Sequence, residues 1–353
     1  MARKYQYLLQ ISLEGSASDN LFKNDIQYAG GGSRLDHITI DENLITLKCE
    51  RVSLIDLDGV FINYQSAIYS QVAKGISFYI CSKQAIPKIE RISLAAKRGD
   101  NIVSEKIITK AELKDPGALL SKFTANFDIN SLKTIFDESE KSSTILKAIS
   151  YLIRSKTKVD PFDQFDSLWK AYNAIYRIIG KSKKDHDCQV ALRNFLIKNK
   201  CASKNTAKKI TGISATSLRS LLRWRALILN DYENAAKSQA FCDFILRYKD
   251  PRIMEVIREI LPYRTKFLTD SNLLETVEDH IDKNIRNNVK CDEEVIALIC
   301  IKYMYFVRNK SAHGERLDRI IGLKTKESKE IKWLSDLLET LIIDLINANH
   351  IYH

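Results

Sequence analysis

The sequence predicts an α+β protein: an antiparallel β-rich N-terminal domain (residues 1–108), a helical connector (109–139) and an all-α helical bundle (140–353). Three observations lead to this prediction. Apolar residues alternate with a period of two in the first part of the chain, and from Ile107 they recur every three to four residues. Only 12 Gly and 5 Pro occur, which favours long helices and few long loops. A chain of 353 residues can bury two separate cores.

Short strands at close spacing are expected throughout residues 4–108. The first of them has apolar residues at every second position: Tyr5, Tyr7, Leu9, Ile11 and Leu13. This is the pattern of a half-buried strand. Further strand-like segments follow, with a turn at Asp41–Asn43 between the first two of them: 37–40, 44–49, 52–57, 60–64, 76–81 and 89–94. Such spacing predicts an antiparallel sheet or sandwich.

Two motifs in this half resemble catalytic loops, and we interpret both as turns. Gly30–Gly32 lacks the Gly-Lys-Ser/Thr ending and the helical start of a phosphate-binding loop, so a flexible loop is expected. Leu54–Val60 holds Asp56 and Asp58 after an apolar run and resembles the nucleophile loop of haloacid-dehalogenase-type phosphatases. That chemistry needs further strands ending in acidic pairs, but the chain turns helical. Asp58-Gly59 is therefore expected to be a hairpin turn.

The helical half is expected to open with a capping box at Thr109–Glu112 and to break at Asp115–Gly117. Its first long helix should start near Ser139, and the second, with Pro161 in its first turn, should end at Gly180. Apolar residues at helical spacing mark the inner faces of these two helices: Ile145, Leu146, Ile149, Leu152 and Ile153, then Phe162, Phe165, Leu168, Trp169, Tyr172, Ile175, Tyr176 and Ile179.

Shorter helices are expected in an inserted segment at about residues 181–290, before the last helix closes the bundle. That last helix has one apolar face: Ile331, Leu334, Leu337, Leu338, Leu341, Ile342, Leu345 and Ile346. Its opposite face is expected to carry Lys329, Asp336, Glu339 and Asp344.

The stretch Val295–Gly314 is the main candidate for a functional site. Its apolar run, residues 295–307, contains Lys302 and is too short to cross a bilayer, so we expect a helix packed on all faces. Polar residues follow directly: Arg308, Asn309, Lys310, His313 and Gly314. An ordinary capped helix end is one reading of them. Arg308 and His313 differ by about 140° around a helix axis, so one straight helix cannot present both on one face.

Arg308-Asn309, a short polar gap and His313-Gly314 after an apolar helix resemble the Arg-x4–6-His motif of the HEPN superfamily. Many HEPN proteins are metal-independent ribonucleases. The helix pair at residues 140–180, with Asn173 beside its aromatic stripe, resembles the opening helices of HEPN domains. The resemblance therefore covers residues 140–353 without the inserted segment. It implies a homodimer in which two protomers pool their Arg and His across a two-fold axis.

The resemblance also implies roles for these residues. His313 would be the general acid or base, Arg308 would hold the scissile phosphate, and Asn309 would orient the histidine or the phosphate through hydrogen bonds. The implied products are a 2′,3′-cyclic phosphate and a 5′-hydroxyl, formed without a cofactor. Lys310, Glu315 and Asn173 are secondary candidates.

A β-rich domain ahead of a HEPN domain resembles the layout of ApeA-like anti-phage abortive-infection proteins. This layout implies RNA as the target and a phage-derived trigger or an antitoxin as a partner. The N-terminal domain would then sense the trigger or restrain the nuclease.

Composition and charge narrow the class of partner and the location. The net charge of +11 favours a polyanion, with nucleic acid ahead of a membrane surface. None of the seven Cys forms a Cys-x-x-Cys pair, so zinc ribbons and redox motifs are excluded, and no carboxylate cluster suggests a metal site. Reduced, buried thiols fit a cytoplasmic location. No signal-peptide core follows the first residues, and no run is long enough to be transmembrane.

Residues 198–225 form a basic segment around Trp224. Its candidate nucleic-acid contacts are Lys204, Lys208, Lys209, Arg219 and Arg223. A solvated helix surface with Trp224 in the core is the alternative. Residues 210–218 also suggest a helix-turn-helix. Three functions follow: a HEPN ribonuclease in defence or as a toxin, a non-catalytic HEPN-like module that binds nucleic acid or protein, and a helix-turn-helix-like DNA-binding regulator.

Overall fold

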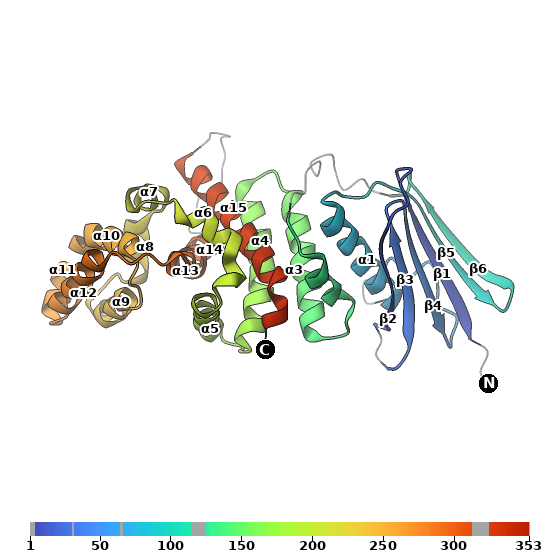
Figure 1. The fold of residues 1–353 in the computed structure, drawn as a ribbon, viewed down its shortest axis with the longest axis horizontal. Coiled ribbons are helices and arrows are strands. Elements are labelled where there is room, and N and C mark those ends of the chain that lie inside the picture. Colours follow the sequence, from blue (N-terminus) through green and yellow to red (C-terminus); the bar gives the residue numbers. More distant parts are fainter. Residues whose placement is uncertain (1–3, 30–31, 64–65, 114–124, 313–324, 353) are drawn as a thin grey trace. The chain divides into compact units, whose positions relative to one another are not determined.

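The computed structural model describes residues 4–29, 32–63, 66–113, 125–312 and 325–352. It divides into two compact units: unit 1 comprises residues 1–178 and 346–352, and unit 2 comprises residues 179–345. Unit 1 holds a six-stranded antiparallel sheet with several helices, and the described part of unit 2 is helical (Figure 1). The α+β fold class predicted from the sequence is confirmed. The predicted bundle at residues 140–353 contributes helices to both units.

The sheet of unit 1 has the strand order β2-β3-β4-β1-β5-β6, and all neighbouring strands are antiparallel. The strands are β1 (Tyr5–Leu13), β2 (Asn20–Gln27), β3 (Leu35–Asp41), β4 (Leu44–Arg51), β5 (Ile89–Arg98) and β6 (Asn101–Thr109). Leu9 in β1 pairs with Leu47 of β4 and with Leu94 of β5, and all three are buried. The period-two alternation thus places the apolar side chains of the central strands on the covered face.

Helix α1 (Ala67–Lys83) covers that face (Figure 1). Gly75 allows the close approach, because a Cβ there would lie 3.2 Å from Ile38 Cδ1 of the sheet. A buried ion pair joins Arg51 Nη1 to Asp36 Oδ1 at 2.7 Å, and Gln71 of α1 donates to Asp36 Oδ2 at 3.3 Å. Packing and hydrogen bonding therefore both fix α1 to the sheet.

Several predicted strands are absent or replaced. The segment 76–81 is the last part of α1, and its burial on nearly all sides hides the helical period. Residues 52–63 contain no strand; Asp58 N–H donates to Asp56 Oδ1 at 3.1 Å within a turn, as the non-catalytic reading expects, although no hairpin surrounds it. The Glu112 carboxylate accepts from Thr109 N–H at 2.8 Å, as in a capping box, but residues 110–112 form a turn.

Two segments that were predicted to be loops or breaks between elements lie wholly or partly outside the described residues. Asp115–Gly117 falls outside them, and of Gly30–Gly32 only Gly32 is described, with a φ of 91°. That backbone conformation is easy for glycine alone, in keeping with a loop.

Besides α1, the helices described in unit 1 are α2 (Ile129–Leu132), the 3₁₀ helix η2 (Lys133–Phe136), α3 (Glu140–Lys156), α4 (Pro161–Gly180, whose end belongs to unit 2) and η7 (Asn349–Ile351). Of these, α2, α3 and α4 begin at a side-chain cap. Ser139 accepts from Ser142 N–H at 3.0 Å, and Asp160 accepts from Phe162 N–H at 2.8 Å. These caps and Gly180 confirm the predicted bounds of α3 and α4.

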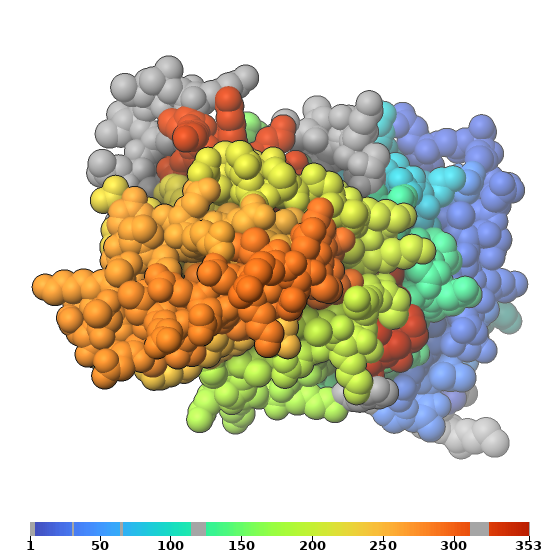
Figure 2. Space-filling view, turned by 60° about the vertical axis from the view of Figure 1, so that its left-hand side comes forward, coloured from blue at the N-terminus to red at the C-terminus, as the bar shows by residue number. Residues whose placement is uncertain are grey.

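Unit 2 consists of the inserted helices, the buried candidate helix and most of α15. Its elements are α5 (Asp185–Lys198), η3 (Lys200–Ser203), α6 (Lys204–Thr211), α7 (Ala215–Leu221), α8 (Trp224–Asp231), η4 (Ala235–Lys237), α9 (Ser238–Leu246), α10 (Pro251–Ile260), η5 (Leu261–Tyr263), α11 (Thr265–Asp270), α12 (Leu274–Asn287), α13 (Asp292–Ala297), a π-helical segment (Leu298–Tyr303), α14 (Met304–Ala312) and α15 (Lys326–Asn347). Helices α10 to α12, in orange, make up much of the surface of unit 2 that Figure 2 shows.

The polar face predicted for the last helix, α15, is only partly exposed. Asp344 and Glu339, which were predicted on the face opposite to the apolar one, are only 5% and 8% exposed, so this face is partly buried as well. The Asp344 carboxylate accepts from the N–H and the hydroxyl of Thr206, both at 2.8 Å, and from Asn205 Nδ2 at 2.8 Å. These bonds attach α6 to α15, and a contact 138 residues away in sequence cannot be read from periodicity.

Within the described residues, no helix is both long and apolar enough to span a membrane. All seven cysteines are free thiols, and five of them are buried: Cys49, Cys81, Cys188, Cys242 and Cys300. In the described part of the chain, no group of three or more His, Cys, Asp or Glu side chains could hold a metal ion.

Candidate functional site

The candidate helix runs from Asp292 to Ala312 through α13, the π-helical segment and α14. Residues 295–307 are buried except for Lys302 and Tyr305, which are half-buried. The predicted buried helix is therefore confirmed. Three acidic residues occupy its first turn, where negative charge stabilises a helix.

A buried ionic cluster fixes the start of this helix. Arg252, 4% exposed, lies between Asp250 Oδ2 at 2.7 Å and Asp292 Oδ1 at 2.8 Å. Asp250 Oδ2 also accepts from Cys291 N–H at 2.7 Å, and the other carboxylate oxygen, Oδ1, accepts from Arg252 Nε–H at 2.9 Å. The charges of Arg252 and Asp250 are paired, and their polar atoms have hydrogen-bond partners. The cluster therefore positions the start of the helix without leaving a buried charge unpaired.

The π-helical segment adds an extra residue to the turn at Leu298–Tyr303. Lys302 lies in this segment and extends its ammonium to the surface, where Nζ lies 2.5 Å from Asp231 Oδ2 and 5.0 Å from the centre of the Tyr232 ring. One inserted residue turns the rest of the helix by about 100°. The segment therefore sets the direction in which Arg308 and Asn309 leave the core. No pattern in the sequence predicts this irregular turn.

Tyr303, at the end of the π-helical segment, anchors the helix to two other parts of unit 2. Its hydroxyl donates to Glu330 Oε1 in α15 and accepts from Arg223 N–H at 2.7 Å. Arg223 Nε lies 2.8 Å from Glu330 Oε2. Burial raises the pKa of the Tyr303 hydroxyl, which keeps the proton on the tyrosine as donor. Burial also raises the pKa of the Glu330 carboxyl, against the effect of the bonds from Tyr303 and Arg223. The network holds α14, the start of α8 and α15 in one arrangement.

At the end of α14, Arg308, Asn309 and Lys310 are half-exposed. Arg308 Nη1 donates to Asn309 Oδ1 at 3.1 Å, so the amide holds one edge of the guanidinium. His313 and Glu315 lie outside the described residues. The described geometry thus provides a buried helix whose polar end presents a cation and an amide together. A guanidinium in this position can bind a phosphate or a carboxylate.

The secondary candidate Asn173 belongs to α4 in unit 1. It is half-buried, and its Oδ1 accepts from Arg177 Nε at 3.0 Å. The arginine one turn further along the same helix orients the amide. This contact gives Asn173 a local structural role.

The five basic candidates form two groups that the sequence did not distinguish. Lys204, Lys208 and Lys209 are exposed on α6, and Lys209 Nζ donates to the Asp336 carbonyl of α15 at 3.1 Å. Arg219 of α7 pairs instead with Glu259, and Arg223 pairs with Glu330 and Glu327.

Trp224 lies between these basic residues in sequence and is 2% exposed. Its Nε1–H donates to the Leu218 carbonyl at 3.0 Å. The alternative reading, with this tryptophan in the core, is confirmed. Trp224 therefore offers no stacking surface to a nucleic-acid base.

Sequence reasoning missed two exposed lysines of α15 as candidate contacts with nucleic acid. Lys329 and Lys332 precede Asp336 at helical spacing and lie on the same side of α15 as that residue. The contact of Lys209 with Asp336 brings α6 beside this side. We call Lys204, Lys208, Lys209, Lys329 and Lys332 the α6–α15 lysine face.

Comparison with known proteins adds no relative: no protein-family model matches the chain, and no curated protein or solved structure matches it either. Any function assigned to the chain therefore depends on its own residues and on the motif resemblance.

Proposed function

We propose that this protein is a metal-independent endoribonuclease of the HEPN type, acting as a homodimer in the cytoplasm in anti-phage defence, abortive infection or toxin action. One observation carries the proposal: a helix buried over residues 295–307 presents Arg308 and Asn309 where its burial ends, and Arg308 precedes His313 by five residues. An ordinary helix cap requires neither a buried helix before it nor an amide that orients the guanidinium.

The proposed reaction assigns a task to each residue. The 2′-hydroxyl of RNA attacks the adjacent phosphorus and its proton goes to His313 of one protomer, while the bond from phosphorus to the 5′-oxygen breaks and the protonated His313 of the second protomer gives its proton to the leaving oxygen. Arg308 holds the phosphate and neutralises the charge that builds up on it. Asn309 orients the guanidinium, and Lys310 and Glu315 are secondary. The products are a 2′,3′-cyclic phosphate and a 5′-hydroxyl.

The α6–α15 lysine face supports a nucleic-acid substrate. Its five lysines are exposed, and within the described residues Lys204 and Lys208 take part in no ion pair. Lysines of this kind can neutralise backbone phosphates, and the resulting affinity should fall steeply with salt. The β-rich part of unit 1 would sense a phage-derived trigger or bind an antitoxin.

The ion pairs of Arg219 and Arg223 favour this proposal over the helix-turn-helix regulator. Each arginine would have to leave a glutamate before it could bind a DNA phosphate. The non-catalytic binding module remains the second candidate, because an ordinary helix end could also carry Arg308 and Asn309.

The test is RNA cleavage by the purified full chain and in phage-infected cells, with the new ends analysed chemically. We expect 2′,3′-cyclic phosphate ends from the wild type and their loss in His313→Ala and in Arg308→Ala. His186→Ala, which removes an exposed histidine of α5, is the matched control and should cleave normally. Equal cleavage by all the variants would refute the proposed site. No cleavage by the wild type in either setting would favour the binding module.

A further inference from the structure

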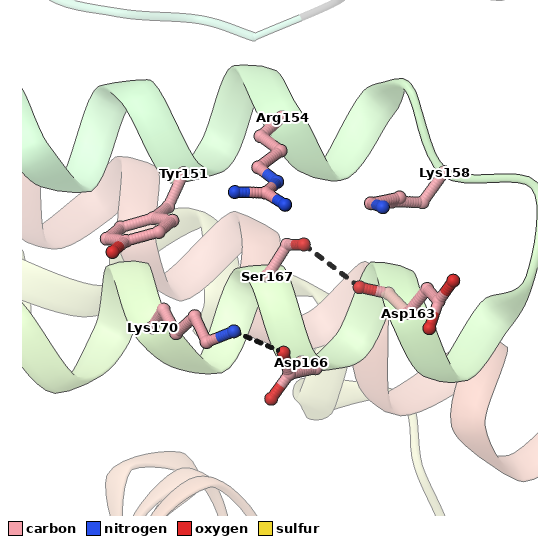
Figure 3. Close-up of a pocket in the computed structure, with 7 residues that line it drawn as sticks. All are labelled: Tyr151, Arg154, Lys158, Asp163, Asp166, Ser167 and Lys170. Carbon is pink, nitrogen blue, oxygen red and sulfur yellow. Dashed lines mark hydrogen bonds and ion pairs between the residues drawn. The ribbon is translucent and has the colours of Figure 1, made fainter.

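A pocket in unit 1 lies between α3 and α4, apart from the residues proposed to cleave RNA. Figure 3 shows Arg154 and Lys158 extending from the α3 side toward α4. Among the described residues, neither side chain takes part in an ion pair. Arg154 lies in the last turn of α3 and Lys158 lies two residues beyond the end of that helix. Both cations line the same pocket, where like charges repel each other. An anion between them would remove that repulsion.

The α4 side of the pocket can also hold an anion. Ser167 lines it, is 5% exposed, and donates its hydroxyl to the Asp163 carbonyl at 3.0 Å. Such a bond to the preceding turn is weak, so the hydroxyl can rotate and donate to a ligand. The α4 residues of the pocket span the first three turns of that helix, so one end of the pocket lies at the positive end of the helix dipole.

Carboxylates at the edge of the pocket do not cancel its positive charge. Asp166 pairs with Lys170 at 2.7 Å, and Figure 3 shows the Asp163 side chain turned away from Ser167. With Arg154, Lys158 and Lys170 against two carboxylates, the lining is net positive. A small, doubly charged anion suits it better than a neutral ligand.

Tyr151 narrows the class of ligand. Its ring lines the same pocket, one turn before Arg154 and on the side opposite to Lys158 (Figure 3). An aromatic ring followed by two cations can stack on a base while binding the phosphate attached to it. We propose that the α3–α4 pocket binds the phosphate of a nucleotide, with Arg154 and Lys158 on the phosphate and Tyr151 against the base.

The test is calorimetric titration of the full-length protein with uridine 5′-monophosphate, with inorganic phosphate and with uridine. We expect the nucleotide to bind more tightly than phosphate, and uridine to bind weakest. Arg154→Gln should weaken nucleotide binding about tenfold or more, since a charge-assisted contact is lost. Lys147→Gln removes another exposed cation of α3 and should leave the affinity unchanged. Tyr151→Leu should weaken binding of the nucleotide but not of inorganic phosphate.

Several results would overturn this assignment. Equal affinities of the Arg154→Gln and Lys147→Gln variants, equal binding of uridine and its monophosphate, or no heat from the nucleotide would each do so. Phosphate binding as tight as that of the nucleotide would overturn the role of Tyr151. His313→Ala should bind the nucleotide like the wild type, so failure of the ribonuclease proposal would not be mistaken for failure of this one.

Discussion

Replacing Tyr303 by Phe tests whether the hydroxyl at the end of the π-helical segment anchors the candidate helix. The substitution keeps the ring, which packs 6.2 Å from the Trp224 ring centre, and removes only the hydrogen bonds to Glu330 and Arg223. Glu330 is 5% exposed, so water cannot readily replace the lost donor. A hydrogen bond to a charged group contributes about 1.5–3 kcal/mol. Arg223 Nε stays on the carboxylate, so we expect a loss of about 2 kcal/mol.

Urea unfolding followed by tryptophan fluorescence measures this loss, because Trp224 lies beside the substituted ring. The midpoint should fall while the slope with urea stays unchanged. Tyr263→Phe is the matched control. Tyr263 is 43% exposed, so losing its hydroxyl should change stability by less than about 0.5 kcal/mol.

A second substitution isolates the hydrogen bond between Tyr303 and Glu330. If Tyr303→Phe and Glu330→Gln act on one hydrogen bond, their combined effect should be smaller than the sum of the single effects. Equal midpoints for Tyr303→Phe and Tyr263→Phe would refute the anchoring role. Strict additivity with Glu330→Gln would refute the coupling between α14 and α15.

Three further predictions concern stability. Gly180→Ala should lower the free energy of urea unfolding by about 1–3 kcal/mol, because the new Cβ would lie 2.5 Å from the Cys188 Cα. The control Gly212→Ala should be nearly neutral, because nothing lies within 4 Å of the new Cβ. Equal effects would contradict the steric argument. Arg252→Met should lower the free energy of unfolding by about 3–5 kcal/mol, since it leaves the fully buried Asp250 without its cation. Adding Asp250→Asn should recover part of that loss, and no recovery would contradict the charge argument. Burial raises the pKa of Asp344, so the folded state favours the protonated form of this carboxyl. The contribution of Asp344 to the free energy of unfolding should therefore be full below about pH 4 and should decline as the pH rises through the pKa of the folded state. The stability of the wild type relative to Asp344→Asn, followed by urea unfolding across this range, should therefore decline with rising pH, and a flat difference would contradict the assignment.

The elements that sequence alone predicted well are those that local signals define. Ser139, Asp160-Pro161 and Gly180 bound α3 and α4, and an apolar run interrupted by Lys302 defines the candidate helix. Local signals failed where burial or exposure is uniform. Helix α1 is buried on most sides, and its segment 76–81 has the apolar pattern of a strand, while β6 is largely exposed and shows no alternation of apolar residues.

Contacts between distant residues explain why the site was only partly predictable. The end of the buried helix at Arg308 and Asn309 follows from the polarity change in the sequence. The engagement of Arg219 by Glu259 and of Arg223 by Glu330 does not, because these partners are 40 or more residues away. Basic composition could therefore mark the segment but not separate exposed lysines from paired arginines.

The most direct test of the central claim is RNA cleavage by a mixture of two inactive variants, Arg308→Ala and His313→Ala, refolded or co-expressed to allow mixed dimers. If one protomer supplies the guanidinium and the other protomer supplies the imidazole, the mixture should regain part of the wild-type activity and yield 2′,3′-cyclic phosphate ends. If mixed dimers form, as native mass measurement can establish, and the mixture stays inactive while the wild type cleaves, the shared site is contradicted.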